Sequence, residues 1–217
     1  MRIAALYDVH GMPWALESVL AELRNERVDA VVFGGDLVAG PFPAETLALA
    51  HGVPGTRFVR GNAEREPDER VVTILGTEEV ERQRAWPAAV VLDDVLFCHA
   101  TPGSDMEIVT DASADEKIAA ALDGVEARLV VGGHTHMQQR RGAYVNAGSV
   151  GMPYEGEVAA FWLLVDQGEP SFRRTPFDVD SAIDLLMRSD WPDARAFAED
   201  NLRRSVSRNE AIAVFGG

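Results

Sequence analysis

Seven side chains of the types that bind metal ions are spread along the first two thirds of the chain. They are aspartates, histidines and one asparagine: Asp8, His10, Asp36, Asn62, His99, His134 and His136. Four of the five histidines in the chain belong to this set. The Asp-x-His and His-x-His pairs each present two ligating atoms on the same side of a short segment, as a divalent metal ion requires. The sequence therefore predicts a metal site built from oxygen and nitrogen ligands.

Each of these residues follows a short apolar run that predicts a buried strand. The runs cover residues 2–8, 30–33, 57–59, 95–98 and 129–131. Because α/β sheets place their ligand sites at the carboxyl ends of the strands, we expect the seven side chains to meet at one edge of the fold.

The remaining segments alternate with these strands as an α/β fold with mixed sheets requires. Helices are expected after Pro13, over 44–50, and after a capping box formed by Ser113 and Glu116. The other expected elements are a hairpin over 89–98 around Asp93-Asp94, strands near 143–145 and 159–165, and an irregular, partly helical excursion over 65–84. From residue 178 onward the apolar spacing predicts two helices separated by Trp191-Pro192.

Composition narrows the class of function. The 217 residues carry 35 acidic and 20 basic side chains, and the net charge of −15 repels polyanions, so a small substrate is expected and nucleic acid is not. A single cysteine, Cys98, excludes an intramolecular disulfide and any site made of several thiolates. No apolar run reaches the roughly 18 residues of a membrane span, and no signal-like segment opens the chain, so no membrane partner and a cytoplasmic location are expected.

Five segments carry a family resemblance. In order and spacing, over about residues 1–165, they resemble the five motifs of the calcineurin-like metallophosphoesterases: Asp8-Val9-His10-Gly11, Gly35-Asp36, Arg60-Gly61-Asn62-Ala63-Glu64, His99, and Gly132-Gly133-His134-Thr135-His136. The stretches 35–41 and 146–151 resemble the small bacterial and archaeal phosphoesterases of that superfamily. The resemblance implies a four-layer αββα sandwich of mixed sheets. We expect one domain over 1–217, with a helical extension from about 176.

The resemblance also implies a dinuclear site. Asp8, His10, Asp36 and His136 would hold one metal ion, and Asp36, Asn62, His99 and His134 would hold the other. Asp36 would then bridge them, since two cations roughly 3.5–4 Å apart need a shared anionic ligand. Nitrogen and oxygen ligands suit Mn²⁺, Fe, Zn²⁺, Co²⁺ or Ni²⁺.

In such a site a water molecule shared by both ions becomes a hydroxide that attacks phosphorus in line. Asn62 and His99 would serve this reaction as ligands. Arg60, which precedes the third motif, matches an arginine that clamps a phosphate oxygen in related phosphatases.

One position departs from the family pattern. Many relatives have a histidine after Gly-Asn that acts on the leaving group, and here the residue is Ala63. General acid–base catalysis typically contributes about 10² to 10⁴ in rate, so poor leaving groups should be cleaved slowly and diesters or activated esters are favoured. The alternatives are a phosphomonoesterase or protein phosphatase with weak acid catalysis, and a non-catalytic binding or scaffold protein that keeps the fold. A repair nuclease is disfavoured by the charge.

Several neighbouring residues are given supporting roles. Glu64 is expected to orient a ligand histidine or a backbone group. Asn146 and Ser149 are expected either to hydrogen-bond ligand side chains or to form a plain turn. The extension after residue 176 could be a lid, a dimer surface or cover for the core, and a homodimer is possible.

Overall fold

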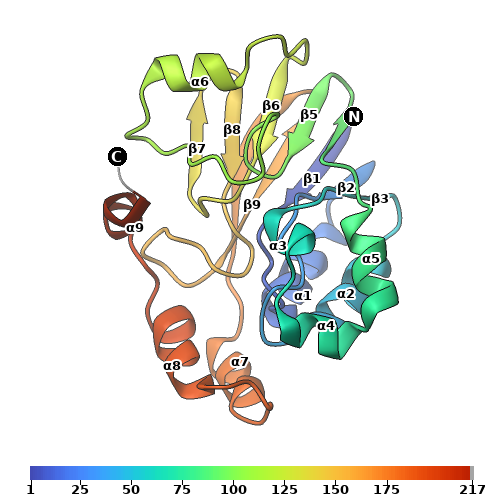
Figure 1. Cartoon of the computed structure of the whole chain (residues 1–217), viewed down its shortest axis with the longest axis vertical. Coiled ribbons are helices and arrows are strands. Elements are labelled where there is room, and N and C mark those ends of the chain that lie inside the picture. Colours follow the sequence, from blue (N-terminus) through green and yellow to red (C-terminus); the bar gives the residue numbers. More distant parts are fainter. Residues whose placement is uncertain (216–217) are drawn as a thin grey trace.

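The computed structural model describes residues 1–215 and contains two five-stranded β-sheets packed face to face (Figure 1). The first sheet has the strand order β10-β9-β1-β2-β3, and the second has the order β4-β5-β6-β8-β7. The strands are β1 (Arg2–Leu6), β2 (Ala30–Phe33), β3 (Thr56–Phe58), β4 (Ala89–Leu92), β5 (Val95–Cys98), β6 (Leu129–Gly132), β7 (Gln138–Arg141), β8 (Tyr144–Ala147), β9 (Ala160–Asp166) and β10 (Glu169–Thr175).

Helices cover the outer face of each sheet, with α6 on the second sheet and most of the others around the first, while α9 lies near β7 of the second sheet (Figure 1). They are α1 (Pro13–Leu23), α2 (Pro43–His51), α3 (Asn62–Arg65), α4 (Glu69–Leu75), α5 (Thr77–Arg84), α6 (Asp115–Ala121), α7 (Val179–Leu186), α8 (Ala194–Ala198), the π-helical turn η1 (Glu199–Arg203) and α9 (Arg208–Phe215).

Three apolar layers hold these elements together. Alternate residues of β1 face opposite sides, so Ile3 and Ala5 join the core between the sheets while Ala4 and Leu6 join the core under the helices of the first sheet. A third, smaller cluster lies between the second sheet and α6. Because β1 is covered on both faces, its sequence is a continuous apolar run rather than an alternating one. The four-layer α/β sandwich with mixed sheets is confirmed.

The sheet topology brings the carboxyl ends of several parallel strands together. β1, β2 and β3 are parallel neighbours in the first sheet, and β5, β6 and β8 are parallel neighbours in the second. The antiparallel strands β9, β10, β4 and β7 make both sheets mixed. Each sheet thus brings the loops after its parallel strands to one edge.

Element positions agree with most sequence expectations, with small shifts. β1 ends at Leu6 rather than at residue 8, and β3 begins and ends one residue earlier than expected. The hairpin forms around Asp93 and Asp94, which both have positive φ, the conformation that two-residue hairpin turns require. The excursion over 65–84 is more regular than expected, because it folds into α4 and α5.

The predicted capping box is wrong. Helix α6 begins at Asp115 with Ala114 in the cap position, and no side chain caps it. The Ser113 hydroxyl instead accepts a hydrogen bond from the backbone N–H of Thr110, at 3.0 Å. A local turn has therefore captured the side chain that the motif would have used.

Two strands have no counterpart in the sequence prediction. β7 is made entirely of Gln and Arg, and β10 contains Pro170 and three charged residues. Both are edge strands, where one side of the backbone is unpaired and polar residues and proline are tolerated. A search for apolar runs misses such strands.

The C-terminal segment consists of helices, with the predicted break at Trp191-Pro192 between α7 and α8. Ala182, Leu186 and Leu202 are buried in the core under the first sheet, so much of this segment covers the core. Within residues 1–215, no helix is both long and apolar enough to cross a membrane.

Candidate metal centre

The strand ends bring all seven predicted ligands into one region. Asp8, His10 and His136 form one group and Asp36, His99 and His134 form another, and within each group the candidate ligand atoms lie within 4.8 Å of one another. Asn62 joins the second group, because its Oδ1 lies 3.0 Å from Nε2 of His99. The sequence partition into two sets of ligands matches the two groups.

Asp36 lies between the two groups. Its Oδ2 is 3.9 Å from Nε2 of His10, and its Oδ1 is 3.5 Å from Nε2 of His99. One carboxylate oxygen therefore faces each group, which is the arrangement that a bridging ligand requires.

Three of the four histidines are oriented by backbone carbonyls. Nδ1 of His10 is 3.1 Å from the Ala39 oxygen, Nδ1 of His99 is 2.9 Å from the Gly34 oxygen, and Nδ1 of His136 is 2.6 Å from the Met152 oxygen. A carbonyl can only accept, so each Nδ1 carries the proton and donates it. The Nε2 lone pair of the neutral ring then points into the site, as in metal-bound histidines.

The backbone of the ligand loops is held in an uncommon conformation. Five of the seven predicted ligands have φ between 51° and 66°: Asp8, His10, Asp36, His134 and His136. For residues other than glycine this left-handed conformation costs on the order of 1–3 kcal/mol each, and such strain collects at functional sites. Hydrogen bonds between the loops hold this conformation. One of them runs from the His10 N–H to the backbone carbonyl oxygen of Asp36, at 3.0 Å.

The site also has an acceptor without a donor. Asp8 is fully buried, and its Oδ2 accepts a hydrogen bond from the backbone N–H of His134 at 2.9 Å. Its Oδ1 has no hydrogen-bond partner, although Nε2 of His136 lies 3.3 Å away. A buried carboxylate oxygen and facing Nε2 lone pairs repel one another unless a cation lies between them. The residues therefore fit a metal pair.

Charges in the site are strongly coupled. Burial alone would raise the pKa of Asp8, but His136, His99 and His10 outweigh it and lower that pKa, which keeps the carboxylate ionised. Burial, followed by the nearby His136, lowers the pKa of His10. Burial alone would also lower the pKa values of His99 and His136, but the Asp8 and Asp36 carboxylates outweigh it and raise both, so metal binding at these two imidazoles would displace protons.

Glu64 supports the centre from behind. Its carboxylate accepts hydrogen bonds from the backbone N–H groups of Asp36 at 2.9 Å, Leu37 at 2.8 Å and Gly61 at 2.8 Å. Burial, with the adjacent Asp36 carboxylate, raises the pKa of Glu64 to about 7. Of its two expected roles, Glu64 orients backbone groups, and it ties the loop after β2 to the loop after β3.

The turn after β8 holds the loops of both sheets. Nδ2 of Asn146 donates to the Gly133 oxygen and to Oγ1 of Thr135, and the Ser149 hydroxyl donates to the Asp8 oxygen at 2.7 Å. These residues therefore bind the backbone of ligand loops rather than ligand side chains. Cys98 is buried, and burial raises the pKa of its thiol to about 12, so it stays an apolar core group.

Sequence reasoning missed a chain of contacts from the C-terminal extension to the site. Tyr154 stacks on the His136 ring at 4.7 Å between centroids, and its N–H donates to the His136 oxygen. The loop that carries Tyr154 is held by Ser205, whose hydroxyl donates to the Pro153 oxygen, and by Arg208, which donates to both oxygens of Glu155. No local motif marks Ser205 and Arg208, because their partners in this loop lie 52 and 53 positions away.

These contacts predict an effect at a distance. Replacing Arg208 with Gln should loosen the loop behind His136 and weaken Mn²⁺ binding about three- to tenfold, less than the 10–100-fold typical of a direct outer-shell partner. Arg203→Gln is the matched control, since within residues 1–215 Arg203 pairs only with Glu199, one helical turn away. Mn²⁺ titration of the metal-free variants measures the effect, and equal affinities would contradict it.

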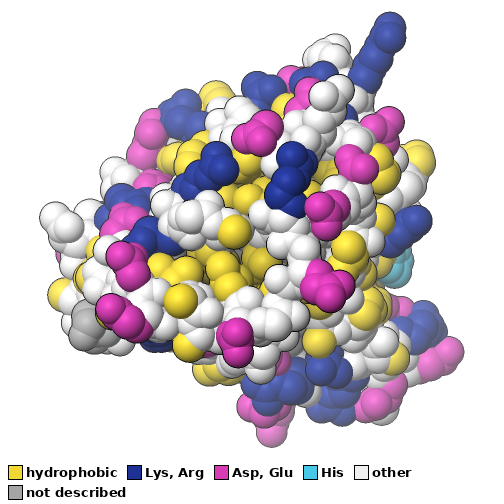
Figure 2. Space-filling model, turned by 90° about the horizontal axis from the view of Figure 1, so that it is seen from above, with side chains coloured by type: hydrophobic (Ala, Val, Ile, Leu, Met, Phe, Trp, Pro, Cys, Tyr) yellow, Lys and Arg dark blue, Asp and Glu magenta, His cyan; other side chains and the backbone are white. Residues whose placement is uncertain are grey.

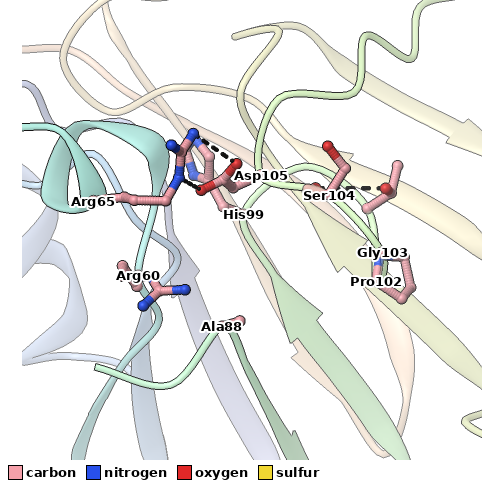
Figure 3. Close-up of a pocket in the computed structure, with 9 residues that line it drawn as sticks. Arg60, Arg65, Ala88, His99, Pro102, Gly103, Ser104 and Asp105 are labelled. Atoms are coloured by element: carbon pink, nitrogen blue, oxygen red, sulfur yellow. Dashed lines mark hydrogen bonds and ion pairs between the residues drawn. The ribbon is translucent and has the colours of Figure 1, made fainter. Parts of the chain in front are cut away.

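A cavity of about 300 Å³ opens beside the second group of ligands (Figure 3). Its wall includes His99, Ala88, Arg60 and the loop over residues 101–105. Arg65, which the sequence prediction did not single out, also lines it and is paired with Asp105. Arg60 and the proposed ligand His99 therefore line the same cavity.

Comparison with known proteins agrees with this geometry. The chain belongs to the calcineurin-like phosphoesterase superfamily, whose domain model matches residues 1–167. Membership supports hydrolysis of phosphoric esters, and the two ligand groups indicate a dinuclear site for divalent metal ions. No curated protein sequence matches this chain significantly.

Solved structures share the fold at low identity. A metallophosphoesterase from Sphaerobacter thermophilus is 22% identical with a TM-score of 0.73, over 89% of this chain and 96% of that one. A hypothetical protein from Pyrococcus horikoshii OT3 is 19% identical with a TM-score of 0.76, over 91% of this chain and 97% of that one. An archaeal phosphodiesterase is 13% identical with a TM-score of 0.52, over 80% of this chain and 99% of that one.

Proposed function

We propose that this protein is a dinuclear metal-dependent phosphoesterase that hydrolyses a small phosphodiester or nucleotide. The observation that carries the proposal is Asp36, which presents one oxygen to each of two groups of buried ligands. Asp8, His10, Asp36 and His136 would hold one ion, and Asp36, Asn62, His99 and His134 the other. The donor set suits Mn²⁺, Fe, Zn²⁺, Co²⁺ or Ni²⁺.

When bound, such an ion pair activates water as a nucleophile and neutralises charge on the phosphoryl oxygens. The side chains of the protein would orient the metal ligands and provide positive charge for the substrate. The carbonyl contacts of His10, His99 and His136 fix the directions of their Nε2 atoms. Arg60 would donate to a phosphate oxygen of the substrate.

Ala63 favours esters with good leaving groups. Its N–H donates to Oδ1 of Asp36 at 2.9 Å, so the residue is next to the proposed bridge and has no side chain that could transfer a proton. A leaving group with a low pKa departs without protonation, whereas an alkoxide does not. One structural neighbour is an archaeal phosphodiesterase, which is compatible with this preference.

The surface is compatible with a small substrate. Figure 2 shows one face of the molecule, on which basic side chains are interspersed with acidic ones rather than gathered into a broad patch. Nucleic-acid binding relies on such a patch to release counterions. The strained ligand loops also argue against a non-catalytic scaffold, which would gain nothing from that cost.

Leaving-group dependence tests the proposal. With Mn²⁺ bound, phenyl esters should be far slower than nitrophenyl esters. The proposed preference for diesters, a separate point because both substrates release p-nitrophenolate, predicts that kcat/KM for bis-p-nitrophenyl phosphate exceeds that for p-nitrophenyl phosphate by at least about tenfold. Ala63→His should narrow the gap between phenyl and nitrophenyl esters, because it returns a proton donor. A preference for the monoester, or rates independent of the leaving group, would contradict the proposal.

A further inference from the structure

The cavity beside His99 is a cationic subsite. Figure 3 shows the Arg60 guanidinium between the Arg65–Asp105 pair and Ala88. Asp105 and Glu66 both pair with Arg65, so within the described residues Arg60 is the cavity cation that no carboxylate neutralises. In a chain with a net charge of −15, this is a local attraction for an anion beside the metal ligands.

Arg60 has most of its donors free. A guanidinium has five N–H donors, and Nη1 of Arg60 uses one of them on the Arg84 oxygen at 3.1 Å. Its Nε is buried without a partner, and no carboxylate lies within ion-pair distance of Arg60 in the described part of the chain. The hydrogen bond to the Arg84 oxygen holds the guanidinium at Nη1 and leaves the remaining Nη donors for a ligand.

Arg65 is held in place by Asp105. Its Nε donates to Oδ2 of Asp105 at 2.6 Å and its Nη2 donates to Oδ1 at 3.1 Å, while Nη1 contacts Glu66. Three of its five donors are therefore used and two are free. The hydrogen bonds from Arg65 lower the pKa of Asp105, so the pair is charged. It links α3, which begins at Asn62, to the loop that begins at His99.

We infer that this cavity seats a phosphate leaving group, so that the substrate is a phosphoanhydride whose departing phosphate lies against Arg60 and Arg65. The inference rests on the proposed function, because the attacked phosphorus must lie at the metal centre. Water oxygen forms the new bond to that phosphorus, and the bond from phosphorus to the bridging oxygen breaks. The electron pair stays on the departing phosphate, and the protons of water pass to the products and the solvent.

Ala63 supports the same substrate class independently. A phosphate monoester has a second pKa of about 6, so it leaves as an anion at neutral pH and requires no proton donor. Its added charge is spread over oxygens that two guanidinium groups can bind. An alkyl diester would need the acid that position 63 lacks, and it would bring no charge into the cavity.

The test compares two diester substrates on the Mn²⁺-loaded protein. Diadenosine pyrophosphate carries the anhydride, and bis-p-nitrophenyl phosphate reports the proposed function without a phosphate leaving group. We expect Arg60→Gln and Arg65→Gln each to lower the ratio of kcat/KM for the anhydride to that for the aryl diester by about tenfold. Arg82→Gln is the matched control, because in the described part of the chain Arg82 pairs only with Glu78 and Glu79 on its own helix.

The outcomes separate the two proposals. Cleavage of the aryl diester without cleavage of the anhydride would overturn this inference and leave the proposed function standing. An unchanged ratio in both cavity variants would also overturn it, and circular dichroism of each variant shows that the fold is intact. Failure to cleave either substrate would instead count against the proposed function.

Discussion

Replacing Asp36 with Asn is expected to remove metal-dependent phosphoester hydrolysis, with kcat/KM falling at least about 1,000-fold. The loss of an outer-shell partner alone typically costs 10–100-fold, and Asp36 is proposed to bind both ions directly. Asparagine offers one neutral oxygen and an amide, so it cannot give an anionic oxygen to each group. Bound metal should fall from two ions per chain to one or none.

The control for this prediction is Asp166→Asn. Asp166 is 56% exposed at the end of β9 and approaches Arg2 at 3.9 Å, so the same chemical change there should leave metal content and rate within about twofold. Elemental analysis of the dialysed proteins and initial rates on bis-p-nitrophenyl phosphate give both readouts. An Asp36→Asn protein that keeps two ions and wild-type rates would exclude the bridging role.

Replacing Glu64 with Ala should be the most destabilising change near the site. Glu64 is 1% exposed, and its loss leaves the N–H groups of Asp36, Leu37 and Gly61 buried without acceptors. An unsatisfied buried group costs about 1–3 kcal/mol, so the free energy of unfolding should fall by about 3 kcal/mol after relief of the repulsion with Asp36 is subtracted. The loops carrying Asp36 and Asn62 should also separate, so metal affinity should fall.

Urea unfolding of the metal-free protein measures the stability effect, since metal binding would add its own stabilisation. Glu66→Ala is the matched control, because Glu66 is 77% exposed and its surface pair with Arg65 should contribute less than about 1 kcal/mol. Equal urea midpoints for Glu64→Ala and the wild type would show that the three hydrogen bonds do not hold the loops.

The ligand positions were predictable because they follow a strong local pattern. Asp8, Asp36 and His99 each come directly or nearly directly after a buried apolar strand, and parallel strands bring their carboxyl ends together. Rare polar residues at those points therefore define the site before any coordinates are known. The division into two ligand sets, with Asp36 as the proposed bridge, comes instead from the family resemblance.

The supporting residues were not predictable in the same way. Met152 and Tyr154 act on His136 through a loop that is fixed by Arg208, and nothing in the sequence between these positions marks the contact. Arg65 looks like an ordinary charged surface residue until Asp105 is brought beside it, 40 positions further on. Such roles depend on tertiary packing, which periodicity does not report.

Local motifs also failed where a competing contact existed. Ser113 and Glu116 have the spacing of a capping box, but the turn from Thr110 uses the Ser113 hydroxyl. The polar strand β7 pairs with β8 through its backbone, whatever its side chains are. In both cases the backbone partner decided the structure, and the side-chain pattern misled the prediction.

Mn²⁺ titration of the metal-free wild-type protein tests the central claim most directly, with bound metal and hydrolysis of bis-p-nitrophenyl phosphate followed in the same samples. The dinuclear account predicts two Mn²⁺ per chain at saturation and activity that rises as the second ion binds. Two bound ions with no cleavage of any phosphoester, or cleavage that persists without metal, would contradict it.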